Sequence, residues 1–334
     1  MEAHDSTILE ELSRLKEEFE KFSDLSLKEV NRKNTERPFG MLNLPSKGLF
    51  YKNKNKFLLI GHLTYFEENI LTSEMMHEAD IAMPIIMEKV IANNDFDIKE
   101  ILSCDVQAIS MFLRAYAYGN NIEVDIECPH CGKKDKHNVT ISSFQSKDND
   151  LVPDENGELS VVTKYDKKLK IKPKTYFEEM EFKNGPEKKQ IESVAFYLTE
   201  YEGERNKNEI LRILYKLKLP EFRDIKKVVF DNLPGIDSTI LYNCVYCEKD
   251  TQINFGNNGA DFLKLPSTFI NNVLEEMFLL SHYGSGFSFE SAKKMTVTER
   301  RWMINRLSEE LQKKKEAEEA AVRSAKSKSK GKKF

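Results

Sequence analysis

Two pairs of cysteines, each spaced C-x-x-C, constrain the fold of this 334-residue chain more than any other feature. They lie between short β-favouring segments, in IEVDIECPHCGKKDKHNVTI (residues 122–141) and STILYNCVYCEKDTQINF (residues 238–255). Each segment is typical of a β-hairpin with a zinc knuckle at its turn. A shared ion would bring the two hairpins together and make the 112 residues between the pairs an insertion. Loop closure costs only about 0.6 kcal/mol more per doubling of length, so an insertion of this size is tolerable.

The cysteines predict one structural Zn²⁺ per chain. Its four ligands would be Cys128, Cys131, Cys244 and Cys247. Four soft sulfur ligands favour tetrahedral zinc and leave no position for a catalytic water. The alternatives are two unrelated pairs or redox dithiols, but a thioredoxin-like dithiol opens a helix, whereas both pairs here lie between strands. His130 and His137 are interpreted as exposed turn residues, and the fifth cysteine, Cys104, as an inert buried thiol.

The remaining sequence predicts an α+β fold, with mainly helical modules around the split four-cysteine ribbon. Residues 1–40 read as an amphipathic helix from about residue 7 with a linker, and residues 41–142 as a front domain that carries the first knuckle. Residues 143–235 form the inserted α/β subdomain, and residues 236–265 the second knuckle that completes the ribbon. Residues 266–312 follow as a helical module, and residues 313–334 as a basic disordered tail.

Signals at helix ends refine this division. Ser73 and Asp105 are interpreted as N-caps, and Gly119 as the end of a helix. Thr296 and Glu299 form a T-x-x-E capping box at the start of the last helix. The acidic pairs at positions 67–68 and 178–179 are predicted to lie on solvated helix faces.

Charge argues against a nucleic-acid-binding body. The chain carries a formal charge of −4, but the nine basic and three acidic residues at positions 313–334 leave −10 on residues 1–312. The two hairpins together sum to −2, whereas phosphate binding requires clustered positive charge. Without a secretory signal, an apolar span or a recognisable catalytic motif, the sequence indicates a cytoplasmic protein that is not an enzyme and has no membrane or small-molecule partner.

Three segments in order, LPSKGLFY, ILSCDVQAISMFLRAYAYGNN and IECPHCGKK, resemble the baseplate hub assembly proteins of contractile-tailed, T-even-type bacteriophages. The likeness covers roughly residues 41–142. In that family a Pro-Ser-x-Gly turn precedes a helical segment with an Asp, an Arg and a terminal Tyr-Gly. The matching residues here are Pro45, Ser46, Gly48, Asp105, Arg114, Tyr118 and Gly119. Arg114 lies on a largely apolar helix, where it would pair with an acidic neighbour or line an interface.

Residues 268–312 resemble a second phage pattern, the small helical module of tail assembly chaperones. The matching residues are Phe287, Met295, Glu299 and Arg300. Phe287 and Trp302 are the expected partner-binding anchors, because the module holds more aromatic surface than its own seam needs.

Together these resemblances imply a non-catalytic assembly factor or chaperone. It would bind the tape-measure protein or baseplate hub subunits in the host cytoplasm during tail assembly. A structural component of the mature virion baseplate is one alternative. A zinc-ribbon regulator that binds nucleic acid through the basic tail is another.

Overall fold

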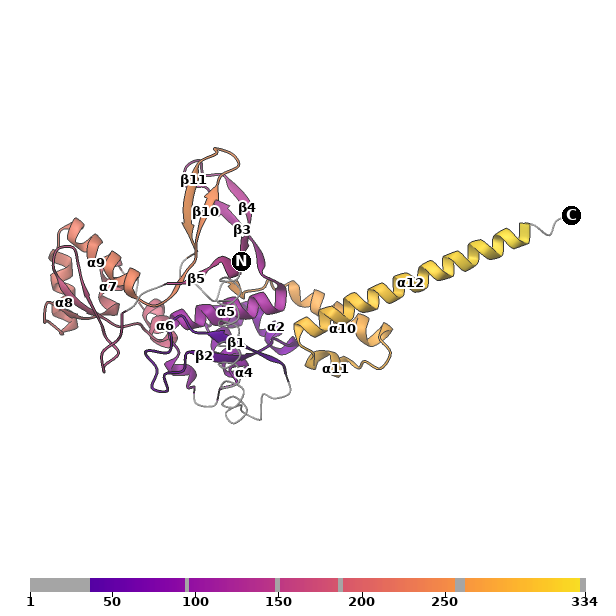
Figure 1. Ribbon diagram of the computed structural model, residues 1–334, viewed down its shortest axis with the longest axis horizontal. Helices are drawn as coiled ribbons and strands as arrows, with labels where there is room; N and C mark the ends of the chain where they lie inside the picture. The colour runs from indigo at the N-terminus through magenta and orange to yellow at the C-terminus, as the bar shows by residue number, and fades with distance from the viewer. Residues whose placement is uncertain (1–36, 94–95, 148–150, 186–188, 256–261, 331–334) are drawn as a thin grey trace, which may run out of the picture.

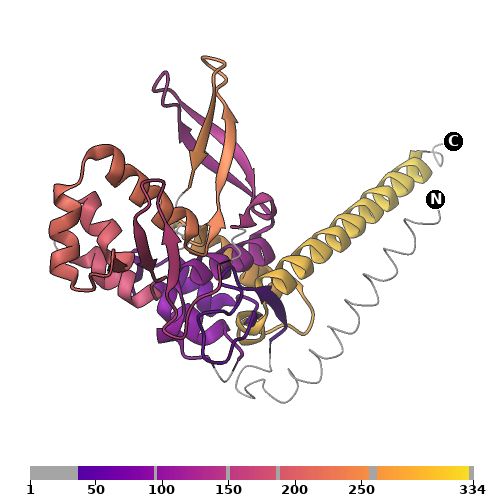
Figure 2. The ribbon, with the colours of Figure 1, turned by 60° about the vertical axis from the view of Figure 1, so that its left-hand side comes forward.

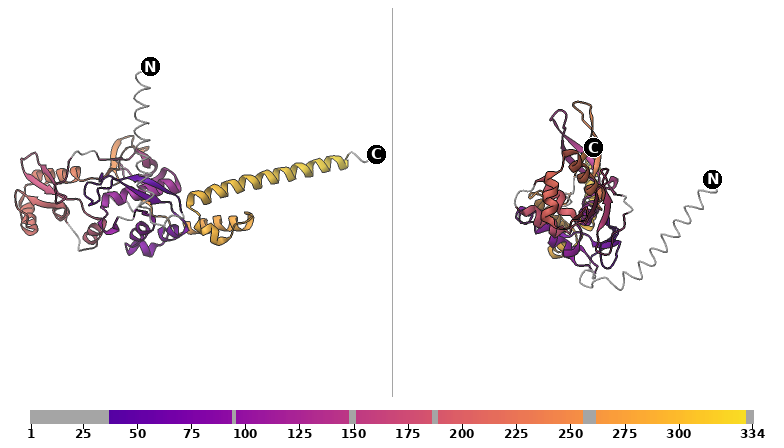
Figure 3. Two further views of the ribbon diagram at one scale, coloured as in Figure 1. Left: turned by 60° about the horizontal axis from the view of Figure 1, so that its bottom comes forward. Right: turned by 90° about the vertical axis from the view of Figure 1, so that its left-hand side faces the viewer.

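The computed structural model describes residues 37–93, 96–147, 151–185, 189–255 and 262–330, so the amphipathic helix predicted near the N-terminus lies outside it. The described chain is α+β, as the sequence predicts. It forms a central body from which three parts extend: an inserted lobe, a pair of β-hairpins and a long C-terminal helix (Figure 1). Figure 3 shows the same parts from two further directions.

The central body consists of a short antiparallel sheet and a set of helices. Its elements are β1 (Phe39–Asn43), β2 (Phe57–Gly61), α2 (Tyr65–Leu71), α3 (Glu74–Glu78), α4 (Ala82–Val90), η2 (Ile98–Glu100) and α5 (Ser103–Tyr118). Strand β2 is buried, and α5 lies at the centre of the body (Figure 1). Apolar side chains from β2, α4 and α5 share one core. This core holds α5, the helix that leads into the first hairpin, in place.

Asp105 ties the loop before β2 to helix α5. Its fully buried carboxylate accepts hydrogen bonds from the Ser46 amide at 3.0 Å and the Tyr51 hydroxyl at 2.6 Å. Gly48 in this loop has φ of 70°, and a Cβ there would lie 2.3 Å from the Asn55 carbonyl oxygen, so only glycine fits. The prediction that Asp105 caps a helix is wrong, because α5 has no side-chain cap and the carboxylate serves the loop instead.

The other end signals are borne out. The Ser73 hydroxyl accepts a hydrogen bond at the start of α3, and α5 ends at Gly119 with φ of 91°. Thr296 and Glu299 make both hydrogen bonds of a capping box.

Two antiparallel hairpins form the projecting arm. Their strands are β3 (Asn121–Glu127) with β4 (Lys134–Thr140), and β10 (Thr239–Asn243) with β11 (Asp250–Asn254). Figure 2 shows the two hairpins standing side by side with their turns farthest from the body. A single turn of 3₁₀ helix, η3 (Ile141–Ser143), follows β4. Strands β5 (Gln145–Ser146) and β9 (Ile236–Asp237) then pair antiparallel, so the chain leaves and re-enters the arm through a two-stranded neck.

Beyond this neck lies the inserted lobe, which has a core of its own. It contains β6 (Leu159–Val162), β7 (Lys168–Ile171), α6 (Tyr176–Asn184), α7 (Gln190–Tyr197), β8 (Leu198–Tyr201), α8 (Lys207–Lys216) and α9 (Leu219–Asn232). The sheet has the order β6-β7-β8 with antiparallel neighbours, and α7, α8 and α9 pack against it.

The C-terminal part comprises α10 (Phe269–Tyr283), α11 (Phe289–Lys294) and α12 (Val297–Lys330). Helix α12 runs for 34 residues and extends away from the body (Figure 1). The disordered tail predicted from residue 313 is therefore wrong up to residue 330. This segment is rich in Ala, Glu and Lys, which have high helix propensity. Ion pairs at helical spacing, such as Lys313 with Glu310 and Arg323 with Glu319, stabilise it further.

Candidate metal centre

The four predicted ligands lie at the tips of the two hairpins, in turns of the same geometry. In the first turn the Cys128 amide donates to the Lys133 carbonyl, and the Gly132 amide donates back to Cys128. In the second turn the Cys244 amide donates to the Lys249 carbonyl, and the Glu248 amide donates back to the Cys244 carbonyl. The residue that follows each second cysteine has a left-handed backbone, with φ of 69° at Gly132 and 56° at Glu248. The repeated C-x-x-C spacing thus encodes a repeated local structure.

The sulfur atoms form a compact cluster. All four Sγ atoms lie within 4.8 Å of one another. Two contacts between the hairpins, Cys128 with Cys247 and Cys131 with Cys244, measure 3.7 Å each. A tetrahedral ion with Zn–S bonds near 2.3 Å would place its sulfurs about 3.8 Å apart. These distances are too long for disulfides and suit a four-coordinate metal.

The surroundings of the cluster favour a thiolate at Cys244, whereas they raise the pKa of Cys131 and Cys247 in the absence of a metal. Cys128 and Cys244 are buried and Cys131 is exposed. Burial raises the pKa of the Cys244 thiol, but the amides that follow it in the turn outweigh this and bring its pKa to about 6. The hydroxyl of Tyr242 is fully buried beside the Cys244 sulfur, and no hydrogen bond of good geometry satisfies it. A metal-bound thiolate would supply the negative acceptor that this hydroxyl lacks.

An apolar seam below the cysteines holds the hairpins together. Ile126 and Tyr242 are buried between them, with Ile240 and Ile253 partly buried alongside. The ring of His137 meets that of Tyr242 edge-on at 5.5 Å, so it packs on the seam. Among the residues that the structure describes, the cysteines are the one group of three or more side chains placed to hold a metal. The set is closed, so it can serve as a structural cross-link rather than as a catalytic centre.

Phe287 and Trp302, the expected partner anchors, differ in exposure. Phe287 is partly buried against the core of α10 and α11. Trp302 is 60% exposed on α12, one helical turn beyond Thr298, whose hydroxyl donates to the carbonyl of Tyr116 at the end of α5. The structure therefore does not bring the two anchors into one environment.

A buried charge network, not expected from the sequence, joins the C-terminal helices to the body. Arg300 is fully buried and donates to both oxygens of Glu68, at 2.7 and 2.9 Å, and to Glu276 at 2.7 Å. The Tyr118 hydroxyl donates to Glu68 as well. The prediction of a solvated face at positions 67–68 is wrong. The T-x-x-E box formed by Thr64 and Glu67 would have signalled the helix start, but nothing local signals the partner 232 residues away.

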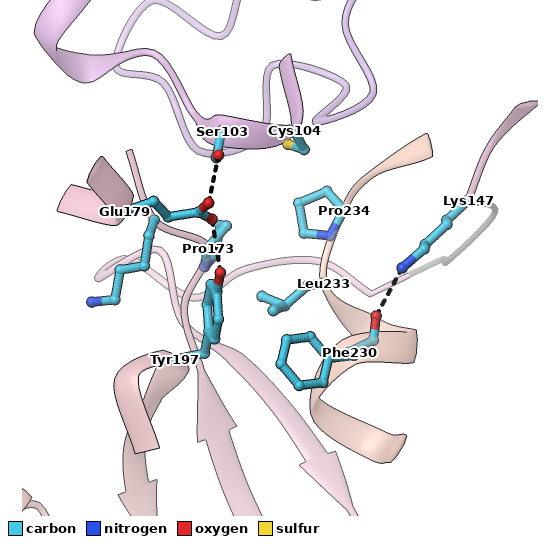
Figure 4. A pocket seen from close by; sticks show the side chains of 10 residues that line it. Ser103, Cys104, Lys147, Pro173, Glu179, Tyr197, Phe230, Leu233 and Pro234 are labelled. Atoms are coloured by element: carbon cyan, nitrogen blue, oxygen red, sulfur yellow. Dashed lines mark hydrogen bonds between the residues drawn. The ribbon is translucent and has the colours of Figure 1, made fainter. Parts of the chain in front are cut away.

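Glu179, also expected on a solvated face, links the inserted lobe to the body. Its carboxylate accepts hydrogen bonds at 2.7 Å from Ser103 of α5 and from Tyr197 of α7 (Figure 4). The hollow beside it measures about 30 Å³, which has room for ordered water but not for a metabolite. Cys104 is partly buried and lines this hollow, and burial raises the pKa of its thiol.

Among the described residues, no helix combines the length and the apolar character needed to cross a lipid bilayer.

Comparison with known protein families matches residues 62–264 to the family described as T4 bacteriophage base plate protein. The match spans most of the body, both cysteine pairs and the inserted lobe, and it ends before α10. No curated protein and no solved structure shows significant similarity to the chain.

Proposed function

This chain belongs to the T4 bacteriophage base plate protein family, and on that premise we propose that it is a non-catalytic assembly factor of the baseplate hub. Membership of the family gives it a structural or assembly role in the phage baseplate. The proposal goes further: the protein binds the tape-measure protein or hub subunits in the host cytoplasm and keeps their helices from associating wrongly until assembly begins.

The observation that carries the proposal is the exposed Trp302 on a rigidly held helix. Two residues before it, Arg300 is fixed by its ion pairs with Glu68 and Glu276. A large aromatic side chain presented on an ordered helix loses little entropy on binding, and tryptophan is enriched among binding hot spots. Phe278 and Tyr283 of α10, each about half exposed, add further aromatic surface to the same module.

Phe287 has a different place in this proposal. Because it packs against the core of its own module, we assign it to the support of α10 and α11, with any contact to a partner made by its exposed edge.

The proposed cofactor is one structural Zn²⁺ per chain. Its ligands would be Cys128, Cys131, Cys244 and Cys247, the four sulfurs that cluster at the hairpin tips. When bound, the ion cross-links two hairpins that share only a narrow apolar seam. The chain thereby acquires a stiff arm that projects from the body.

A permanent virion component is the second candidate, since the family name covers parts of the finished baseplate. Regulation through nucleic acid fits the chain less well. The hairpins sum to −2, and acidic side chains such as Glu123 and Glu127 engage the nearby lysines of β4. The arm therefore lacks the clustered positive charge that phosphate binding requires.

Affinity purification of the tagged chain from infected cells, sampled through the assembly period and from mature particles, tests the proposal. We expect the tape-measure protein or hub subunits with the chain during assembly, and little of the chain in mature particles. Stoichiometric presence in mature baseplates would instead establish the virion component. Recovery of polymerase or DNA in place of tail proteins would refute an assembly role.

A further inference from the structure

A hollow of about 280 Å³ lies at the base of the arm, where α5 meets β3. Its lining combines two kinds of residue. The apolar members are Ile122, Val124, Phe255 and Phe262, and the charged members are Arg114, Glu123 and Lys264. The volume has room for one large side chain of another molecule.

The charges in this hollow do not balance. Glu123 is engaged by Lys136 of the neighbouring strand at 2.5 Å. Among the residues that the structure describes, no carboxylate pairs with Arg114 or Lys264. The hollow therefore offers two cations without a counter-charge from the described chain.

Arg114 is held in place without being neutralised. Its guanidinium lies 4.9 Å from the centroid of the Tyr118 ring, and the guanidinium of Arg301 lies at the same distance from that ring. Burial lowers the pKa of Arg114, and the charge of Arg301 lowers it further. A partly desolvated cation beside a second cation gains more from a carboxylate than a solvated one does.

We propose that this hollow binds an acidic peptide segment of a partner protein. An apolar side chain of the segment would lie against Phe255 and Phe262, and an adjacent carboxylate would pair with Arg114 and Lys264. The Arg114 guanidinium can donate two parallel hydrogen bonds to a carboxylate. Burial of an apolar side chain against the two aromatic rings is favourable because it removes apolar surface from water. The net charge of −2 on the two hairpins disfavours a nucleic-acid strand at this position. The inference does not depend on the role in hub assembly.

Two short peptides serve as matched probes for the full-length protein: acetyl-Phe-Glu-amide and its isosteric partner acetyl-Phe-Gln-amide. Ligand-observed NMR titration measures both affinities. We expect the glutamate peptide to bind about tenfold more tightly than the glutamine peptide, because only the former makes charged hydrogen bonds. This preference should shrink in Arg114→Gln and in Lys264→Gln. Lys264→Gln leaves the contact of Arg114 with Tyr118 within α5 intact, so it tests the charge without disturbing the body.

Lys52→Gln is the control, because Lys52 is an exposed lysine that pairs with Glu100 away from the hollow. Equal binding of the two peptides, no binding of either, or a preference unchanged by both hollow variants would overturn the proposal.

Discussion

Glu68 and Arg300 are the residues on which the junction between body and C-terminal helices depends. Both side chains are fully buried, so each charge relies on the other. We expect Glu68→Gln to lower the free energy of unfolding by about 3–5 kcal/mol, because it leaves the guanidinium buried with reduced compensation. Glu276→Gln should cost less, since that side chain is 24% exposed and water can replace its contact. Urea unfolding of the two variants checks this order, and equal losses would contradict it.

The two knuckle turns allow a paired test at positions 132 and 248. Gly132 has φ of 69° and open space around its Cβ position, so Gly132→Ala tests backbone strain alone. Glu248 has φ of 56°, a left-handed backbone conformation that is strained for a residue with a Cβ atom. We expect Gly132→Ala to destabilise the metal-loaded arm, and Glu248→Gly to stabilise it, each by about 0.5–1 kcal/mol. Denaturant unfolding of the metal-loaded protein measures both, and a shift of the same sign in both would refute the shared geometry.

At this scale the sequence predicts local chemistry well and tertiary partners poorly. The C-x-x-C spacing places two thiolates in one turn, and the cluster of all four sulfurs confirms that inference. The predictions of a solvated face at Glu68 and a helix cap at Asp105 are wrong because Arg300 and the loop at Ser46 set the roles of these carboxylates. Both partners are far away in sequence. Spacing along the chain carries no information about such contacts.

The hairpins are the elements most dependent on the proposed ion. Each is two-stranded, and such a hairpin is marginal in water without further support. We expect one zinc per purified chain, and we expect chelation or Cys128→Ser to accelerate amide hydrogen exchange in residues 122–141 and 238–255 while the body stays protected.

His130→Ala is the matched control for the metal, because His130 lies within the first knuckle but outside the sulfur cluster. It should retain the full zinc content. Reduced protein without stoichiometric metal, or exchange in the hairpins that is indifferent to chelation, would contradict a structural zinc.

Helix α12 joins two segments with different sources of stability. Up to Ile304 it packs on α10, whereas the side chains of residues 308–324 are exposed and the helix there depends on propensity and ion pairs such as Arg306 with Glu309. Removing residues 313–334 should therefore reduce the helical circular dichroism signal and leave the thermal midpoint unchanged. A lowered midpoint would mean that this segment packs against the rest of the chain.

The same segment shows why the sequence prediction of a disordered tail is wrong for residues 313–330. A fading apolar stripe removes the sequence signal for packing, but the loss of packing does not by itself mean disorder. Helix formation needs no apolar face where alanines and i,i+4 ion pairs suffice. The capping box at Thr296 and Glu299, by contrast, is a local signal, and it located the start of the helix correctly.

At the scale of the whole molecule, the α+β class and the relationship to T4-type baseplate proteins were predicted from sequence and are confirmed. The arrangement was not predictable: an arm, an inserted lobe and a long helix leave one body in different directions (Figure 1). It depends on contacts such as Glu179 with Ser103 and Arg300 with Glu68, which join segments 76 and 232 residues apart.

The central claim, that the C-terminal module captures the tape-measure protein or a hub subunit, is tested most directly with Trp302→Ala. Affinity of the purified variant for each purified partner is compared with that of the unaltered chain and of Glu309→Gln, an exposed control on the same helix. We expect Trp302→Ala to weaken binding by about 2 kcal/mol or more with an unchanged thermal midpoint, and the control to bind normally. Unaltered binding in Trp302→Ala, or no binding of either partner by the unaltered chain, would contradict the account.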